Sequence, residues 1–408
     1  MFAAFKFCKM QGVYNAILCF LFSTAAVVAQ NFEPFNVSEN VAIPSQVETV
    51  DLNGDGLDDF IVAGIEKFYW FKNTGNSQFV KISLLDSVQG FWHFALFDWE
   101  NDGDIDIFFT TNYTDQRVAW LENDGSENFT YHLISKTVTG PYYVQPWDLD
   151  KDNDVDILVS SSSTDQLYWL KNDGFNNYTP DTLGNYVNTF SIADLNGDND
   201  WDIIFGRAYT GITYSDVRAF QNDGFNNFSL VTLKTGFQII HEVIVEDVNG
   251  DGYFDIVVPD YYGDEVSWLK NDGTYGFSTK NVIKTNFDGP QGIALLDVNE
   301  DGKKDLIVGS YNADEIYYFQ GQGSTSSFGF SSGTLIYNGL NQISDLAIGN
   351  FDNQNKKDFV HTDGANDEVS VWVNNGSQVF TQNKLSSSFD TPRAFDMKDL
   401  DGDGDQDV

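Results

Sequence analysis

The amino-acid sequence predicts an all-β protein, a β-propeller of about seven, or else eight, four-stranded antiparallel blades. Aromatic residues make up 15% of the 408 residues and glycine contributes 35 of them, a composition that favours strands joined by tight turns. A nine-residue acidic pattern recurs with successive starts 46 to 53 residues apart. That period is too long for most helical repeats and fits a propeller blade of four strands.

The chain carries a large negative charge. It has 61 acidic and 22 basic residues, which gives a formal net charge of -39. A surface of this sign repels nucleic acid and anionic membranes, so we expect neither as a partner. The acids recur along the whole chain instead of forming a tail, which indicates that they are organised to hold cations.

Residues 1–29 have the features of a secretory signal peptide. Lys6 and Lys9 form a short basic region, an apolar run from Ala16 to Val28 follows, and Val27-Val28-Ala29 fits the small-x-small cleavage rule. We therefore expect the mature chain to start near Gln30, to be secreted, extracellular or held at the cell surface, and not to insert into a membrane. The alternative is an uncleaved membrane anchor, although the apolar run is shorter than the roughly 20 residues that span a bilayer.

Both cysteines, Cys8 and Cys19, lie within this signal segment. After cleavage the chain holds no cysteine, so no disulfide supports the fold. Packing and bound metal remain as sources of stability.

The nine-residue pattern has eight copies in the mature chain. They are D-L-N-G-D-G-L-D-D from Asp51, D-W-E-N-D-G-D-I-D from Asp98, D-L-D-K-D-N-D-V-D from Asp148, D-L-N-G-D-N-D-W-D from Asp194, D-V-N-G-D-G-Y-F-D from Asp247, D-V-N-E-D-G-K-K-D from Asp297, N-F-D-N-Q-N-K-K-D from Asn350 and D-L-D-G-D-G-D-Q-D from Asp399.

Four short strands are expected around each copy. An apolar stretch precedes the pattern, as at 94–97, and a β-branched or aromatic run follows it, as at 105–109. An aromatic strand that ends in Asn-Asp-Gly comes next, as at 168–174, and a last strand such as 228–233 closes the unit. The Asn-Asp-Gly ends are hairpin signals because Asn and Gly tolerate a positive φ, and the short connections make the strands antiparallel. Each repeat needs its neighbours to bury its faces, so residues 30–408 are expected to form one domain.

The pattern forms an oxygen-rich loop suited to Ca2+. Calcium takes six to eight hard oxygen ligands at about 2.3–2.6 Å, and Gly or Asn at the sixth position permits the tight curl that lets side chains converge. We expect several structural Ca2+ ions, about one per intact loop, with the seventh carbonyl and both oxygens of the ninth-position Asp among the ligands. The expected side-chain ligands, at the first, third, fifth and ninth positions, are Asp51, Asn53, Asp55, Asp59, Asp98, Glu100, Asp102, Asp106, Asp148, Asp150, Asp152, Asp156, Asp194, Asn196, Asp198, Asp202, Asp247, Asn249, Asp251, Asp255, Asp297, Asn299, Asp301, Asp305, Asp399, Asp401, Asp403 and Asp407.

Two other interpretations of the loops are weaker. An EF-hand requires an acid at the twelfth position and flanking helices, but the twelfth positions lie inside expected strands; they are Val62, Phe109, Val159, Phe205, Val258 and Val308. Merely solvated turns would not require acids at fixed offsets in eight loops.

The loops are not equal. Those at Asp98 and Asp148 carry four acids at the ligand positions and are expected to be among the tightest. The copy at Asn350 keeps only Asp352 and Asp358 as charged ligands, so we expect it to bind calcium weakly or to be empty.

The D-x-N-x-D-G-x-x-D loop followed by a W-L-x-N-D-G strand, repeated about every fifty residues, resembles the FG-GAP or VCBS-type repeat. The resemblance covers roughly residues 34–408 and implies a propeller similar to that of integrin α subunits, with calcium in the loops between the first and second strands. The literal Phe-Gly and Gly-Ala-Pro signatures of integrins are mostly missing and no inserted adhesion domain is visible, so integrin-style ligand binding is not carried over.

The blade count depends on the ends of the chain. Residues 35–41 look like a fourth strand with no blade before it, which in many propellers completes the last blade. Seven full repeats follow, and the eighth loop, from Asp399, stops at Val408. Seven blades is the first interpretation; a longer sequence would make eight, and the last repeat is either truncated or vestigial.

The favoured function is that of an adhesion or binding module for an extracellular protein or glycan, not an enzyme, and we expect a monomer. Partner residues are expected five or six positions before each loop, although the same residues could merely line a central channel. They are Gln46, Trp92, His93, Tyr142, Tyr143, Asn188, His241, Glu242, Gln291 and Asp345.

Two alternatives remain open: a calcium-dependent polysaccharide lyase or hydrolase, and a lectin. Glycosidases use paired carboxylates, which 61 acids do not exclude, but no nucleophile elbow, phosphate loop or histidine-rich zinc motif is present. The supply of Trp and Tyr is compatible with a lectin. Asn-x-Ser/Thr sites matter only if the source glycosylates; they are at Asn36, Asn112, Asn128, Asn177, Asn227 and Asn375.

Overall fold

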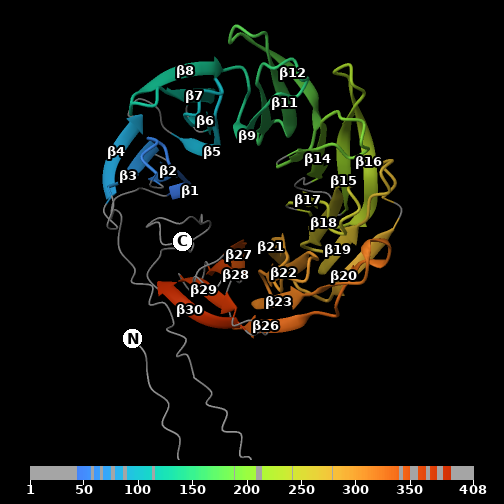
Figure 1. Cartoon of the computed structure of the whole chain (residues 1–408). Helices are drawn as coiled ribbons and strands as arrows, with labels where there is room; N and C mark the ends of the chain where they lie inside the picture. Colours follow the sequence, from blue (N-terminus) through green and yellow to red (C-terminus); the bar gives the residue numbers. More distant parts are fainter. Residues whose placement is uncertain are drawn as a thin grey trace, which may run out of the picture. The chain divides into compact units, whose positions relative to one another are not determined.

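Seven four-stranded antiparallel sheets follow one another along the part of the chain that the structure describes (Figure 1). The computed structural model describes residues 44–56, 59–64, 68–74, 79–85, 90–112, 115–187, 189–207, 214–240, 242–277, 279–339, 343–349, 357–363, 368–374 and 380–386. The expected signal peptide, the expected strand at 35–41, nearly all of the Asn350 loop and the whole Asp399 loop lie outside these residues.

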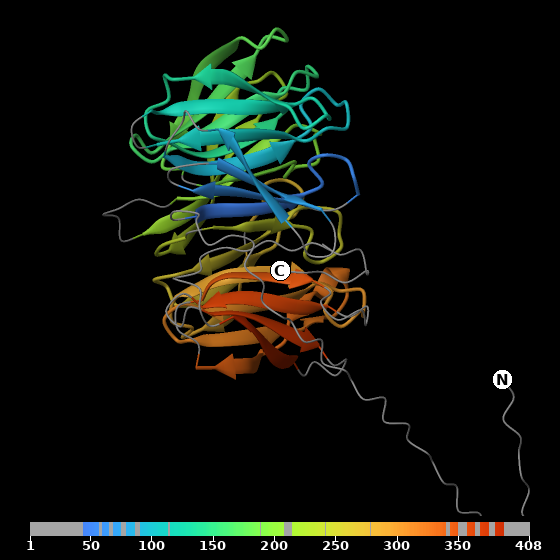
Figure 2. The ribbon, with the colours of Figure 1, turned by 90° about the vertical axis from the view of Figure 1, so that its left-hand side faces the viewer.

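The first strand of each sheet lies nearest the common centre in Figure 1, and the fourth lies at the rim. The first strands are β1 (Pro44–Val50), β5 (Phe91–Phe97), β9 (Pro141–Trp147), β13 (Ser191–Ala193), β17 (Ile244–Glu246), β21 (Pro290–Leu296) and β27 (Ile343–Gly349). Figure 2 shows the strands running across the view, so that the connections gather at two opposite sides.

The second strands form the buried middle of each sheet. They are β2 (Asp59–Gly64), β6 (Asp106–Thr111), β10 (Asp156–Ser161), β14 (Asp202–Gly206), β18 (Asp255–Asp260), β22 (Asp305–Ser310) and β28 (Asp358–Asp363). Every residue of β6, β10, β14, β18 and β22 is buried. Burial of both faces is expected where each sheet is covered on two sides by its neighbours.

The third and fourth strands complete each sheet. The third strands are β3 (Phe68–Asn73), β7 (Arg117–Asn123), β11 (Gln166–Asn172), β15 (Ser215–Asn222), β19 (Glu265–Leu269), β23 (Glu315–Phe319) and β29 (Glu368–Asn374). The fourth strands are β4 (Phe79–Leu85), β8 (Phe129–Ser135), β12 (Tyr178–Asn185), β16 (Phe228–Phe237), β20 (Lys280–Thr285), β26 (Thr334–Asn338) and β30 (Phe380–Ser386). In the sixth sheet the third and fourth strands are separated by the short pair β24 (Gly321–Gln322) and β25 (Gly329–Phe330) and by the 3-10 turn η1 (Thr325–Ser327).

Among the described residues the hydrophobic core is divided into six clusters, and each cluster is made by two consecutive sheets. Alternation along a strand produces this division, because successive side chains point to opposite faces. Ile107 and Phe109 of β6 pack against the first sheet, whereas Phe108 between them packs against the third. We call these clusters the seams between sheets. Each sheet from the second to the sixth therefore depends on both neighbours for its burial.

These findings confirm the all-β propeller fold and the four-strand unit. The six twelfth positions that excluded an EF-hand all lie in second strands, as expected. Seven sheets among the described residues are consistent with seven blades, while the loop on which an eighth depends is not described. In the described part of the chain no helix is long and apolar enough to cross a membrane.

His93 joins the second and third sheets from the innermost strand β5. Its Nδ1 accepts a hydrogen bond from the backbone N–H of Val144 at 3.3 Å, and its ring centroid lies 4.2 Å from that of Tyr143. Burial lowers the pKa of His93 to about 4, because the charged imidazolium would lose its hydration. The folded protein therefore holds neutral His93 at pH 7.

We expect His93→Gln to make the fold less sensitive to acid. Between the ordinary pKa of 6.5 and the folded value of about 4, an unfolded histidine binds a proton that the folded one excludes. Stability is therefore present at high pH and lost as pH falls through this window. Glutamine keeps an acceptor but does not titrate. The fall in the free energy of unfolding from pH 7 to pH 5, measured by urea denaturation, should be smaller in the variant by about 2 kcal/mol. Equal falls in both proteins would contradict this role.

Candidate functional site

The acidic loops connect the first and second strands of their sheets, where the sequence places them. The ninth-position aspartate is the first residue of the second strand in all seven sheets. The first, third and fifth positions lie in the loop itself. The antiparallel order of the sheets brings these loops to the same edge as the turns between third and fourth strands. We call this edge the loop edge.

Two residues of each described loop adopt the left-handed backbone conformation. The sixth position does so with φ between 71° and 98°, which confirms the curl expected from Gly and Asn there. The fourth position does so as well, and in three loops the residue type does not predict it, because Asn101, Lys151 and Glu300 are not glycine. Side chains with a Cβ are strained in this region, so these three positions carry a conformational cost that Gly54, Gly197 and Gly250 avoid.

The first-position carboxylate closes the curl. In the loop at Asp297, its two oxygens accept hydrogen bonds from the backbone N–H groups of Asp301 at 3.0 Å and Gly302 at 2.7 Å. Asp51 makes the same pair of bonds to Asp55 and Gly56. The loop backbone therefore folds around the first carboxylate.

The ninth-position carboxylate is fully buried in every sheet. Its Oδ1 accepts a hydrogen bond of 2.7 to 3.0 Å from a backbone N–H at the end of the third strand; the donors are Asn73, Asn123, Asn172, Asn222, Asn271, Gly321 and Asn374. In the first sheet Oδ2 accepts from the Trp70 indole at 2.8 Å, and in the sixth from the Tyr318 hydroxyl at 2.9 Å. Any oxygen that Asp59 or Asp305 offers to a cation would be shared with these donors.

Burial raises the pKa of the ninth-position acids, to about 6 for Asp59 and Asp202 and to about 7 for Asp156. Hydrogen bonds from the neighbouring N–H groups oppose the shift only in part. A carboxylate in this position is therefore short of compensating positive charge.

The loop at Asp148 is the one that brings three carboxylates together among the described residues. One oxygen each of Asp148, Asp150 and Asp152 lie within 4.8 Å of one another. Oδ1 of Asp148, Oδ1 of Asp150 and Oδ2 of Asp156 are buried without a hydrogen-bond partner. Buried acceptors normally find a donor or a cation. These oxygens fit a hard cation such as Ca2+. The Lys171 ammonium forms an ion pair with Asp150.

The loop at Asp98 is arranged differently. Glu100 lies beside Asp106, and burial together with the charges of Asp106 and Glu122 raises its pKa strongly. Glu122 stands where the third and fifth sheets carry Lys171 and Lys270. This loop therefore faces an additional carboxylate instead of a lysine.

In three sheets, an asparagine at the end of the third strand joins its sheet to the acidic loop of the preceding sheet. In the sequence this asparagine was recognised only as part of a hairpin signal. The Asn123 amide donates to the Leu52 carbonyl of the preceding loop at 2.8 Å, Asn271 to Leu195 at 2.6 Å, and Asn374 to Val298 at 3.3 Å. These bonds join positions 71 or 76 residues apart. The recurrence of Asn at one place in six repeats was the available signal.

Of the expected partner residues, Trp92 and His93 lie on β5, Tyr142 and Tyr143 on β9, and Gln291 on β21. The rings pair across two sheets, with centroids 5.5 Å apart for Trp92 and Tyr142. These residues sit near the start of the first strands, at the edge opposite the loop edge. Asn188 and His241 lie outside the described residues, and the side chains of Gln46 and Asp345 are not described.

Strain at the fourth loop position can be measured at Glu300, which is exposed and has a φ of 61°. We expect Glu300→Gly to be more stable than Glu300→Ala by about 0.5–1 kcal/mol, because only glycine adopts this conformation without a steric cost. Both variants lose the same charge, so their difference in free energy of unfolding isolates the backbone term. Equal stabilities would refute the strain.

The inter-sheet role of Asn271 is testable by truncation. The side chain is fully buried; it donates to Leu195 and Phe254 carbonyls and accepts from the Gly273 N–H at 3.0 Å. Asn271→Ala should lower the free energy of unfolding by about 2–3 kcal/mol, since it leaves buried carbonyls unsatisfied. Asn338→Ala, at an exposed strand end, is the matched control and should change it by less than about 0.5 kcal/mol. A loss no larger than in the control would exclude a stabilising role.

Comparisons with known proteins agree with this geometry. Residues 51–109, 98–159, 148–205 and 247–308 match a family model described as an FG-GAP-like repeat, and together they make up more than half of the chain. Each matched stretch runs from one acidic loop to the second strand of the next sheet. No curated protein matches the chain.

Two solved structures share the fold at low identity. One is a lectin of Agrocybe aegerita, described as specifically recognising non-reducing terminal N-acetylglucosamine: 16% identity over 85% of this chain and 95% of that one, with a TM-score of 0.55. The other is BBS1N in complex with ARL6DN: 12% identity over 86% and 95%, with a TM-score of 0.51. At these identities the likeness concerns the fold alone.

Proposed function

The chain belongs to the FG-GAP-like repeat family, and on that basis we propose that it is a secreted or cell-surface calcium-binding β-propeller that acts as a binding module for a protein or glycan partner. The observation that carries calcium is the loop at Asp148, with three converging carboxylates and three buried oxygens that lack donors.

The residues that would hold the ion in this loop are Asp148, Asp150 and Asp152, with Asp156 expected from its ninth position at the start of β10. Calcium accepts six to eight oxygens in irregular geometry, so a curled loop with side chains of unequal length suits it better than it suits Mg2+. A bound ion would supply positive charge to carboxylates that otherwise repel one another. At a free concentration about ten times Kd, each filled loop adds about 1.4 kcal/mol of stability.

A binding role for the opposite edge is supported by the separation of the acidic loops and the aromatic residues, which lie at different edges of the sheets. The ions and their loops occupy the loop edge, and the aromatic residues Trp92, Tyr142 and Tyr143 lie toward the other edge. Loops and strand ends on a rigid scaffold are common places for recognition. Two proteins of this fold, one named as a lectin and one crystallised with a protein partner, support such a role by analogy.

Calcium should raise the unfolding temperature of the purified chain by about 10 °C if the six described loops that are nearly complete all fill. The same concentration of Mg2+ controls for ionic strength and should give much less. Asp150→Asn should remove one ion from the stoichiometry measured by calorimetric titration. Asp181→Asn, an exposed acid on β12 of the same sheet, is the matched control and should remove none.

An unfolding temperature that ignores calcium would overturn the calcium part of the proposal. Release of reducing ends or unsaturated sugars from polysaccharides by the calcium-loaded chain would overturn the binding part, in favour of a carbohydrate-active enzyme.

A further inference from the structure

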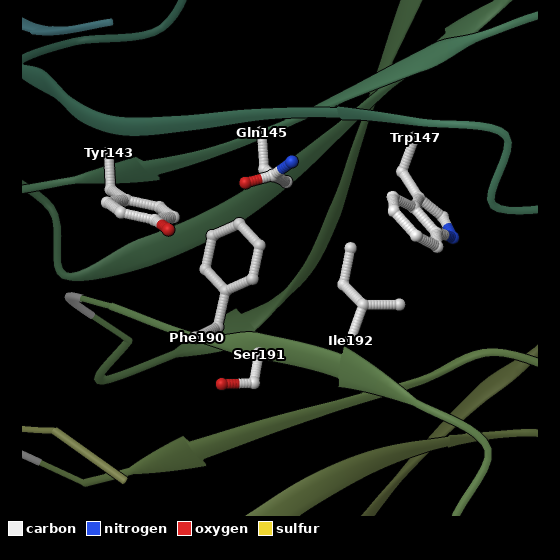
Figure 3. Close-up of a pocket in the computed structure, with 6 residues that line it drawn as sticks. All are labelled: Tyr143, Gln145, Trp147, Phe190, Ser191 and Ile192. Atoms are coloured by element: carbon white, nitrogen blue, oxygen red, sulfur yellow. The ribbon is translucent and has the colours of Figure 1, made fainter. Parts of the chain in front are cut away.

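A groove of about 260 Å³ lies between the first strands of the third and fourth sheets. It is lined by Tyr143, Gln145 and Trp147 from β9 and by Phe190, Ser191 and Ile192 around β13 (Figure 3). A second hollow of about 220 Å³ adjoins it, sharing Tyr143, Phe190 and Ser191 and reaching Glu242 before β17. The two hollows thus share one aromatic pair, Tyr143 and Phe190.

The groove arises where the propeller departs from its own regularity. The first strands β1, β5, β9, β21 and β27 have seven residues each. β13 and β17, in two adjacent sheets, have three each. Residues 189–190 directly before β13 and 242–243 directly before β17 lie outside the strands, and the space beside β9 stays open.

Alternation along β9 places three side chains of different chemistry in this space. Tyr143, Gln145 and Trp147 are two residues apart and so point to the same face, as Figure 3 shows. Across from them the Phe190 ring meets the Tyr143 ring at a centroid distance of 5.1 Å and an angle of 79°. The groove therefore has aromatic walls with an amide between them.

Polar atoms in the groove are left without intramolecular partners. The hydroxyl groups of Tyr143 and Ser191 have no hydrogen-bond partner in the part of the chain that the structure describes. The Gln145 amide has one long contact, 3.4 Å to the Pro146 carbonyl. Aromatic walls bury apolar surface and make weak contacts to C–H groups, while free hydroxyl and amide groups orient a polar ligand.

The charge around the groove selects against anions. Glu242 borders the adjoining hollow, the Glu48 charge acts on Tyr143, and the chain has a net charge of -39. No described lysine or arginine lines either hollow. The three neutral polar groups in the groove suit hydroxyl groups better than they suit an ammonium ion.

We propose that this groove binds one neutral pyranose residue of an oligosaccharide, with the next residue in the adjoining hollow. The sugar ring lies against Tyr143 and Phe190, and its hydroxyl groups bond to Gln145, Ser191 and the Tyr143 hydroxyl. The volume is below the roughly 300–1,000 Å³ of drug-sized pockets, which fits a single ring. The inference rests on the proposed binding function and names its ligand class and site.

The test is binding of the calcium-loaded full chain to immobilised neutral oligomers of glucose, xylose, mannose, galactose and N-acetylglucosamine, with polyuronate as the anionic probe. We expect binding to at least one neutral series with Kd on the order of 10⁻⁴ M and none to polyuronate. Gln145→Ala and Tyr143→Phe should each weaken that binding about tenfold. Gln291→Ala, the matched change on β21 outside the groove, should leave it unaltered. If Gln145→Ala fails to fold, Ser191→Ala replaces it as the groove variant in the binding test.

Absence of binding to every neutral series, or binding that the groove variants leave unaltered, would overturn the inference, as would preference for polyuronate. The calcium-dependent rise in unfolding temperature is recorded on the same samples. If that rise persists while sugar binding fails, this inference falls and the proposed calcium-binding module stands.

Discussion

A buried aspartate at the start of every second strand joins the second strand of its sheet to the third. Its carboxylate reaches the third strand through the backbone N–H at the strand's end, and in the first and sixth sheets it also binds an indole or a phenol. A charge in such a position is costly unless it is hydrogen-bonded. The two strands and the loop must therefore keep one arrangement, and the curl of the acidic loop is built on this fixed point.

In the second, fifth and seventh sheets, the asparagine at the end of the third strand extends this arrangement to the preceding sheet. Its amide donates a hydrogen bond to a carbonyl of the preceding acidic loop, which adds a polar contact beside the apolar seam. A cation in one loop would thus act on two sheets at once. At the opposite edge the first strands vary in length, from seven residues in β9 to three in β13 and β17. The groove beside β9 originates from this difference.

Much of this could be predicted from the sequence because the informative residues recur at fixed offsets. The acids at four loop positions and the Asn-Asp-Gly turns placed the strands and the loops. The left-handed fourth position could not be predicted, since Lys151 and Glu300 are residue types that do not favour this conformation. The groove was missed for a related reason: Tyr143 was identified, but Gln145 and Ser191 become important only because β13 is short. Strand length in these two sheets is decided by packing, which a local pattern does not report.

The seams also bear on how the chain reaches its fold. Each sheet is formed by a contiguous stretch of about fifty residues, and each described cluster joins only consecutive sheets. Folding can therefore begin at any two consecutive sheets and propagate to the neighbouring sheets. We expect it to be faster than the folding of β-sandwiches, which pair segments distant in the sequence. At every stage the newest sheet exposes the apolar face that its successor will cover. During synthesis or export, this apolar face stays exposed until the next fifty residues have emerged and folded over it. The rate of their emergence therefore determines how long the chain is prone to aggregate.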